Sequence, residues 1–428
     1  MGFFSFLYQS PRASATETDP IVDLTTLYPP RNPAVMRRIT KEPHIPIEIV
    51  MNILETAYDD DEPESNVKLF ASCALVCRDW SFIAQKLLFR HVTLDNQTAY
   101  IAFQHAVDRS SPRGRMLGDS VMHMRLTLDH NQPYRLSQRS FARAVTFCPN
   151  LLELRIALFG EGGPGFDVVG SPDSERMKRP APSFDERTLA LLRTGPSIQS
   201  LHFSNWSDNS SSLCQLLDIW PTLKSLSISG VPPQLLNSAA PFPCPLEELR
   251  MNFQTAPSVD FMKWLLHNST SSLRTLEMER EPPLDLLEHL ISEHGASLQS
   301  LALPSCGGHD AVAALQRCDA LRELRIESAW APPVIFKSLS DSVEHIAFGI
   351  DADTPLQPLE KAIKRSEGLR AVTLHIWHGG HDHPQLNAVK VACARRGIEL
   401  RITEDIRVFR VITRGVLDSI PRPLEALY

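Results

Sequence analysis

The chain has 428 residues, of which 43% are hydrophobic and 22% charged, an ordinary composition for a folded protein with a large core. This length suggests either several domains or one elongated repeat structure. The formal net charge is -7 and no run is rich in Lys and Arg, so the sequence has no electrostatic footprint for nucleic acid. No apolar run approaches the roughly 18 residues that a membrane helix needs, so no membrane partner is expected.

The N-terminal stretch up to about Pro43 is rich in Pro, Thr, Ser and Asp and has no sustained period. We therefore expect a mostly disordered leader over 1–43. Its apolar start is short and lacks the basic region of a secretory signal. Gly2 suggests myristoylation, but that pattern needs Ser or Thr at position 6, where Phe6 stands.

Cysteine usage indicates the compartment. The eight cysteines form no CxxC pair, and Cys73 and Cys77 are four residues apart, a spacing that suits packing on one face of a helix. Without a secretory signal, free thiols in a reducing compartment are favoured over disulfides. The sequence therefore predicts a cytoplasmic or nuclear protein.

The first helix is predicted to begin near Pro46. Ile45, Ile49 and Ile53 recur every four residues, and proline suits the first helical turn because its missing N–H costs nothing there. The acidic run from Tyr58 to Pro63 ends this helix and is most simply a solvated loop.

Two more helices follow, with a strand after them. They fit Val67 to Cys77 and Asp79 to Phe89, and Asp79 can cap the second of these. The alternation from His91 to Leu94 predicts a strand. Apolar side chains cover nearly the whole circumference of the middle helix: Leu69, Phe70, Cys73, Ala74, Leu75, Val76, Cys77 and Trp80. Such a helix must be buried on several sides, so either the following domain or another protein covers it.

Beyond Leu94 the chain repeats the pattern apolar–x–x–apolar–x–apolar. The clearest copies begin at Leu151, Ile198, Leu223, Leu246, Leu273, Leu298, Leu321, Val343 and Leu369. From Ile198 the starts advance by 25, 23, 27, 25, 23, 22 and 26 residues, a period typical of leucine-rich repeats. Met124 to Leu128 is similar to an early copy, and Gly397 to Ile402 to a last, partial one.

Amphipathic helical stretches lie between these strands, most clearly at Val259–Asn268, Leu284–Gly295, Ala311–Cys318 and Leu359–Gly368. Each repeat is thus a strand and a helix, and such units bury their apolar faces only by stacking. The fold class predicted is α/β, a three-helix segment followed by an irregular solenoid with parallel strands on the concave side and helices outside. The expected divisions are 1–43, 44–90, 91–412 and a C-terminal tail at 413–428.

The residue between the last two apolar positions of each strand is expected on the concave face. Such strand-face residues, Arg250, Glu277, Arg325 and Glu344, are mixed in charge and name no ligand, so the substrate-binding residues stay unknown. The interval from Leu151 to Ile198 is too long. Its excess, Phe159 to Phe184, is rich in Gly, Pro and Ser and predicts a mobile loop at one edge.

The segment from Pro46 to Leu94 resembles an F-box. The resemblance rests on the Ile45-Pro46 opening, Glu48-Ile49, Ile53-Leu54, the LVCRDW motif of Leu75 to Trp80, and Leu87 to Arg90. The LVCRxW and LLFRHVTL combination looks most like F-box proteins of mushroom-forming fungi, and the pairing with leucine-rich repeats is a recurrent architecture.

The resemblance implies that these helices bind the Skp adaptor of a cullin-based ubiquitin ligase and that the repeats recruit a protein substrate. The adaptor-binding residues it implies are Ile45, Pro46, Ile49, Ile53, Leu54, Leu75, Val76, Cys77 and Trp80. An adaptor would also cover the surplus apolar surface of the middle helix.

Two alternatives differ in class. The first is a non-catalytic interaction scaffold whose helical segment only caps the repeats, since terminal repeats need a cap. The second is a metal site, because four histidines cluster at His375, His378, His381 and His383. Their flexible Gly379-Gly380 turn, with no Cys or Glu beside it, favours an exposed loop, and the sequence has no GxSxG, HExxH or P-loop motif. No enzymatic activity, cofactor or metal is therefore expected.

Overall fold

The computed structural model describes residues 45–58, 63–161, 178–235, 240–306, 309–330, 332–337 and 339–411. The expected leader, the C-terminal tail and the acidic residues 59–62 lie outside these ranges. The chain divides into two compact units. The helical unit comprises residues up to Thr93 with Ile101–Val121, and the repeat unit comprises Leu94–Tyr100 with the residues from Met122 onward.

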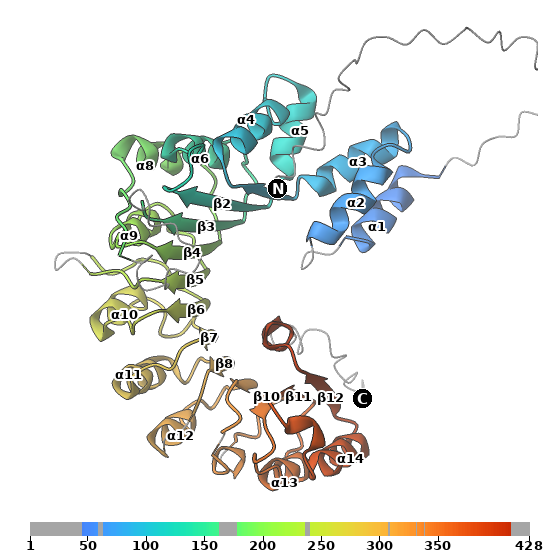
Figure 1. Cartoon of the computed structure of the whole chain (residues 1–428), viewed down its shortest axis with the longest axis vertical. Coiled ribbons are helices and arrows are strands. Elements are labelled where there is room, and N and C mark those ends of the chain that lie inside the picture. Colours follow the sequence, from blue (N-terminus) through green and yellow to red (C-terminus); the bar gives the residue numbers. More distant parts are fainter. Residues whose placement is uncertain are drawn as a thin grey trace, which may run out of the picture. The chain divides into compact units, whose positions relative to one another are not determined.

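The helical unit contains α1 (Ile47–Thr56), α2 (Pro63–Cys73), α3 (Arg78–Leu88), the C-terminal part of α4 (Gln97–Ala106) and α5 (Pro112–Ser120), and the strand β1 (His91–Leu94) begins in it (Figure 1). Its core is a small apolar cluster: Val50, Leu54, Phe70, Cys73, Ile83, Ala84 and Leu87. The unit extends beyond the expected end at residue 90, because α5 packs on α3, where Arg113 Nε donates to Gln85 Oε1 at 2.9 Å.

Three helices form as predicted, but their boundaries differ. The middle helix ends at Cys73 instead of Cys77, and a turn over residues 74–76 separates it from α3. The cap assignment was wrong. Cys77 occupies the N-cap position of α3 with extended backbone, and Asp79 lies inside the first turn, where its charge still suits the positive end of the helix dipole.

The repeat unit is built on one parallel sheet in which β2 to β12 follow one another in chain order (Figure 1). The strands are β2 (His123–Asp129), β3 (Glu153–Phe159), β4 (Ser200–Trp206), β5 (Ser225–Gly230), β6 (Glu248–Phe253), β7 (Thr275–Met278), β8 (Ser300–Leu303), β9 (Glu323–Ile326), β10 (His345–Ile350), β11 (Ala371–Ile376) and β12 (Glu399–Thr403).

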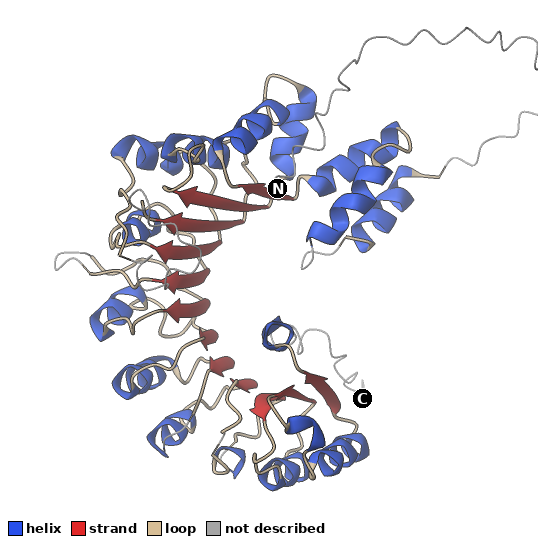
Figure 2. Ribbon diagram, viewed as in Figure 1, coloured by secondary structure: helices blue, strands red, loops and turns tan. Residues whose placement is uncertain are grey.

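Helices line the outer side of this curved sheet (Figure 2). They are α6 (Gln138–Thr146), α8 (Glu186–Arg193), α9 (Ser212–Leu217), α10 (Val259–Leu265), α11 (Leu284–His294), α12 (His309–Leu315), α13 (Gln357–Arg365) and α14 (Leu386–Arg396), with short 3₁₀ turns η2 (Ile335–Lys337) and η3 (Gly380–Asp382). None of the helices in the described ranges has both the length and the apolarity needed to cross a membrane.

The strand register explains the repeat. The second apolar position of each motif aligns with that of the next, from Leu154 to Leu201, Leu226, Leu249 and Leu276. These side chains are fully buried between the sheet and the helices, so each repeat completes the core of its neighbour. The predicted leucine-rich-repeat solenoid is confirmed, and both partial copies are strands, β2 and β12.

The long interval between β3 and β4 is not a loop over its whole length. At its start, Gly160 N donates to Trp206 O at 3.4 Å and Asn131 Nδ2 donates to Gly160 O at 2.8 Å. At its end, Phe184 is buried with its ring 5.7 Å from that of Phe141. Both ends of the predicted 159–184 insert therefore belong to the array, because they satisfy backbone groups or fill the core. Its centre, 162–177, lies outside the described residues.

Candidate interaction surfaces

Large apolar side chains are exposed on α1 to α3 and on the residues that flank these helices. We call this set the apolar surface: Ile45, Ile47, Ile49, Met51, Ile53, Leu69, Leu75, Val76 and Phe82. Leu75 is 87% exposed and Val76 63%. Fully burying a side chain of this kind contributes about 1.5 to 3 kcal/mol, so covering the apolar surface with a partner would be strongly favourable.

Local geometry explains why these side chains stay outside the core. On α1, Val50 and Leu54 face the core, and Ile49 and Ile53 lie about 100° around the helix from them. After α2 the chain turns, with Leu75 N donating to Ser72 O at 3.1 Å and Val76 N to Cys73 O at 3.2 Å. The turn projects two apolar side chains away from a cluster that is already filled.

Most residues implied by the F-box resemblance are accessible. Ile45, Pro46, Ile49, Ile53, Leu75, Val76 and Cys77 are exposed. Trp80 is half-buried against the core cluster, and Leu54 is buried, so Leu54 supports α1 and does not offer a contact. Sequence reasoning did not single out Ile47, Met51 or Phe82 as exposed. The apolar character of α1 on both sides of its core-facing strip was the available signal for the first two.

A second surface is the concave face of the sheet. One row of side chains crosses strands β2 to β12 in register: Arg125, Arg155, His202, Ser227, Arg250, Glu277, Ala302, Arg325, Ala347, Thr373 and Arg401. Three of the four residues expected on this face lie in the row. Glu344 does not, because it precedes β10 and accepts a hydrogen bond from Arg322 Nε at 2.7 Å, while Ala347 takes the row position.

The concave face changes character along the array. From β2 to β6, side chains alternate between buried and partly exposed, so the concave side is accessible. From β9 to β11, every strand residue is buried, and Glu277 and Ala302 are buried on β7 and β8. We call β2 to β6 the open half and β7 to β11 the covered half.

In the open half, Glu153 is the centre of a polar cluster. Its carboxylate accepts from Arg155 Nε at 2.5 Å, and the rings of His123 and His202 each lie 3.6 Å from it. Burial by itself would raise the pKa of Glu153, but His123 and Arg155 outweigh it and lower that pKa to about 2. The ionised carboxylate is therefore favoured in the folded state.

This shift predicts a pH-dependent contribution to stability. Because the folded-state pKa is depressed, the contribution is complete above the unfolded-state pKa of about 4.3 and is lost as pH falls toward 2. We expect Glu153→Gln to lower the free energy of unfolding by about 2 kcal/mol at pH 7 and by progressively less below pH 4. Urea denaturation of both proteins at several pH values measures this. The exposed Glu367→Gln serves as control, and a difference that stays constant with pH would contradict the prediction.

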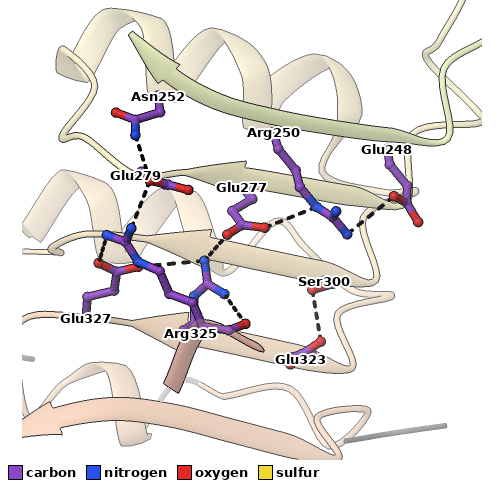
Figure 3. A network of polar contacts seen from close by, with 10 residues as sticks. Glu248, Arg250, Asn252, Glu277, Glu279, Ser300, Glu323, Arg325 and Glu327 are labelled. Atoms are coloured by element: carbon purple, nitrogen blue, oxygen red, sulfur yellow. Dashed lines mark hydrogen bonds and ion pairs between the residues drawn. The ribbon is translucent and has the colours of Figure 1, made fainter. Parts of the chain in front are cut away.

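In the covered half, buried charges on β7 and β9 point toward one another (Figure 3). Arg325 Nη2 donates to Glu277 Oε1, and Arg250 Nε lies 3.2 Å from Glu277 Oε2. The same Arg325 nitrogen lies 3.7 Å from Glu327 Oε1. Glu277 and Arg325 are only 2% and 3% exposed, and each compensates the other's charge there.

A chain of hydrogen-bonding groups lies beside these charges. His345 is fully buried, with Nδ1 3.0 Å from Glu323 Oε1 and Nε2 2.9 Å from Thr373 Oγ1. Ser300 Oγ donates to the other oxygen of Glu323 at 3.1 Å (Figure 3). Glu323, His345 and Thr373 are thus linked by hydrogen-bonding distances across neighbouring strands.

The histidines of 375–383 do not converge. His375 is buried with its ring 4.6 Å from that of Trp377, and His383 Nε2 lies 2.8 Å from the Thr354 carbonyl oxygen. His381 Nε2 lies 2.8 Å from a carboxylate oxygen of Glu404. The described part of the chain contains no group of three or more His, Cys, Asp or Glu placed to hold a metal ion.

No family model matches the sequence, and no curated protein matches it either. Among solved structures, a chain of the Rad7–Elc1 complex of yeast is 14% identical, with 83% of this chain and 92% of that chain covered and a TM-score of 0.39. A chain of the TLR13–ssRNA13 complex is also 14% identical, with 74% of this chain and 36% of that chain covered and a TM-score of 0.30. Neither similarity bears on function, and the solenoid assignment rests on the strand register.

Proposed function

We propose that this protein is a non-catalytic substrate receptor of a Skp–cullin–F-box type ubiquitin ligase. In this role the helical unit binds the Skp adaptor, which links it to a cullin, and the repeat unit binds a protein substrate. The observation that carries the proposal is the apolar surface, because helices α1 to α3 have an apolar core of their own and still leave these side chains in water.

The chemistry of the surface fits an adaptor better than a transient partner. Stable interfaces bury roughly 800 Å² on each side and have an apolar centre. Leu75 and Val76 project furthest, and they are the first two residues of the LVCRDW motif that resembles an F-box. The repeat unit presents its own polar concave face, so the two activities are assigned to different surfaces.

Co-expression with a Skp adaptor tests the proposal. We expect the full chain and the adaptor to co-purify as a 1:1 complex through size-exclusion chromatography and to stay associated in about 0.5 M salt, because an apolar interface is little affected by screening. Full chain that elutes free of adaptor at micromolar concentrations would overturn the proposal and leave the interaction scaffold as the better description.

A further inference from the structure

The chain returns to its own concave face after the last strand. A short helix over 406–411 follows β12 (Figure 1). It carries Phe409, which is fully buried with its ring 5.5 Å from that of His375. Its neighbours Arg407 and Val408 are exposed. Phe409 and the next residue, Arg410, therefore make the contacts with the covered half.

Arg410 binds across two strands of the sheet. Its Nε and Nη2 donate to the two oxygens of Glu327 at 2.8 and 2.7 Å, and its Nη1 donates to Glu279 Oε2 at 2.8 Å. Glu279 follows β7 and Glu327 follows β9. They are separated from Arg410 by 131 and 83 positions in the sequence. Two parallel hydrogen bonds to one carboxylate match the planar guanidinium group of arginine. The ammonium group of lysine cannot form this bidentate pair as well.

The strands supply most of the contacts that hold this site, and the C-terminal segment adds the Arg410 carbonyl, which accepts from Arg325 Nη1 at 3.4 Å. Glu277 is held by Arg250 and Arg325, and Asn252 Nδ2 donates to Glu279 Oε2 at 2.7 Å. With Arg410 removed, the carboxylates of Glu277, Glu279 and Glu327 would face the guanidinium groups of Arg250 and Arg325. At the edge of the network Arg250 Nη2 lies 3.4 Å from Glu248 Oε2, and Arg280 Nε donates to Asn252 Oδ1 at 3.4 Å, so four carboxylates would stand against three guanidinium groups. The excess charge is negative. Glu327 Oε1 would remain 3.7 Å from Arg325 Nη2, and the backbone carbonyl of Glu327 would still accept from Trp377 Nε1 at 2.9 Å.

We propose that the covered half is a binding site for an aromatic–arginine pair on a partner protein, and that Phe409 and Arg410 occupy this site in cis. The inference deepens the proposed receptor function, on which it rests, by naming the class of substrate segment. It concerns the repeat unit alone and uses no contact with an adaptor. Residues 404–411 thus act as a tethered competitor that a partner must displace.

Tethering determines how strongly residues 404–411 compete with a free peptide. A ligand attached by a short linker has an effective concentration on the order of 1 mM at its site. If the free segment binds with a Kd of about 50 to 100 µM, the tether weakens the apparent affinity for a competing peptide roughly 10- to 20-fold. Releasing the segment from the site should raise the apparent affinity for the peptide by the same factor.

A fluorescent peptide of residues 404–411 is the probe, and the full chain is the receptor. The release variant carries Phe409→Asp with Arg410→Glu, and the matched control carries Val408→Asp with Arg407→Glu, which are exposed neighbours with the same charge change. We expect fluorescence anisotropy to show roughly 10-fold tighter peptide binding by the release variant than by the wild type or the control. A peptide with lysine in place of Arg410 should bind roughly 10-fold more weakly.

Equal binding by the release variant and the wild type, or by the arginine and lysine peptides, would overturn the proposal. If the release variant fails to fold, hydrogen exchange on the wild-type chain decides. A peptide with Phe-Arg flanked by Gly and Ser should speed exchange of residues 404–411, and unchanged exchange at millimolar peptide would overturn it. Because neither assay contains an adaptor, failure here leaves the adaptor proposal standing. Failure of the adaptor proposal would leave the peptide-binding result in place but would remove its interpretation as substrate recognition by a ligase receptor.

Discussion

Replacing Arg325 with alanine should lower the free energy of unfolding of the repeat unit by about 3 kcal/mol, the lower end of the range for a broken buried ion pair. The change leaves the carboxylate of Glu277 buried without the guanidinium that compensates its charge. The cost falls at the lower end because Arg250 still contacts the other oxygen of Glu277. Urea denaturation followed by circular dichroism measures the difference.

Two further variants test whether the buried charge causes the loss of stability in Arg325→Ala. Arg322→Ala breaks the contact with Glu344, a pair in which both side chains are partly exposed, and should cost about 1 kcal/mol or less. Arg325→Met combined with Glu277→Leu removes both buried charges and should recover at least about half of the loss, because apolar replacements of a buried pair are often neutral. A loss with Arg325→Ala no larger than that with Arg322→Ala would show that the buried charge is not what matters.

The repeat architecture could be predicted because it is repeated. A single apolar–x–x–apolar–x–apolar motif fits many structures, but a series of copies at a regular spacing requires stacked strands. The register then places Leu201 beside Leu226 and Leu226 beside Leu249, and the same alignment puts Arg250 and Glu277 in one row on the opposite face. The charge network of the covered half was not predicted, because Arg410, which pairs with Glu279 and Glu327 there, comes from a distant part of the sequence.

The helical unit could be predicted less well than the repeats. The apolar run through Leu75 and Val76 continues the helical pattern of α2, although the backbone turns at residue 74. A hydrophobic pattern cannot distinguish a side chain buried by its own domain from one left for a partner. The residue type of Asp79 favours a cap position, but the turn starts α3 at Arg78 and leaves Cys77 as the N-cap.

The two surfaces suit different lifetimes of association. The apolar surface consists of side chains that are unfavourable in water, which favours a long-lived complex with one partner. On the concave face, Glu279 and Glu327 are already paired with Arg410 of the same chain, so a partner that displaced Arg410 would gain only the difference in free energy between its own contacts and those of Arg410. A receptor with these properties would hold its adaptor permanently and exchange its substrates.

The adaptor proposal makes its sharpest prediction at the turn between α2 and α3. Leu75→Asp combined with Val76→Asp should weaken adaptor binding by roughly 100-fold or more, which corresponds to about 3 kcal/mol, because it places two charges at the centre of an apolar interface. Both side chains project into solvent in the free protein, so the melting temperature of the chain should not fall. Isothermal titration calorimetry with the adaptor measures the affinity, and thermal unfolding followed by circular dichroism measures the stability.

Mutating Leu75 and Val76 distinguishes an effect on adaptor binding from an effect on folding. Trp80→Ala would be ambiguous, because Trp80 packs against the core of the helical unit. Val391→Asp is the matched control: Val391 is also exposed and apolar, but it lies on α14 of the repeat unit, so its replacement should leave adaptor affinity within about twofold. If the double variant binds the adaptor as tightly as the wild type while Val391→Asp weakens binding, the interface lies on the repeat unit and the apolar surface serves another partner.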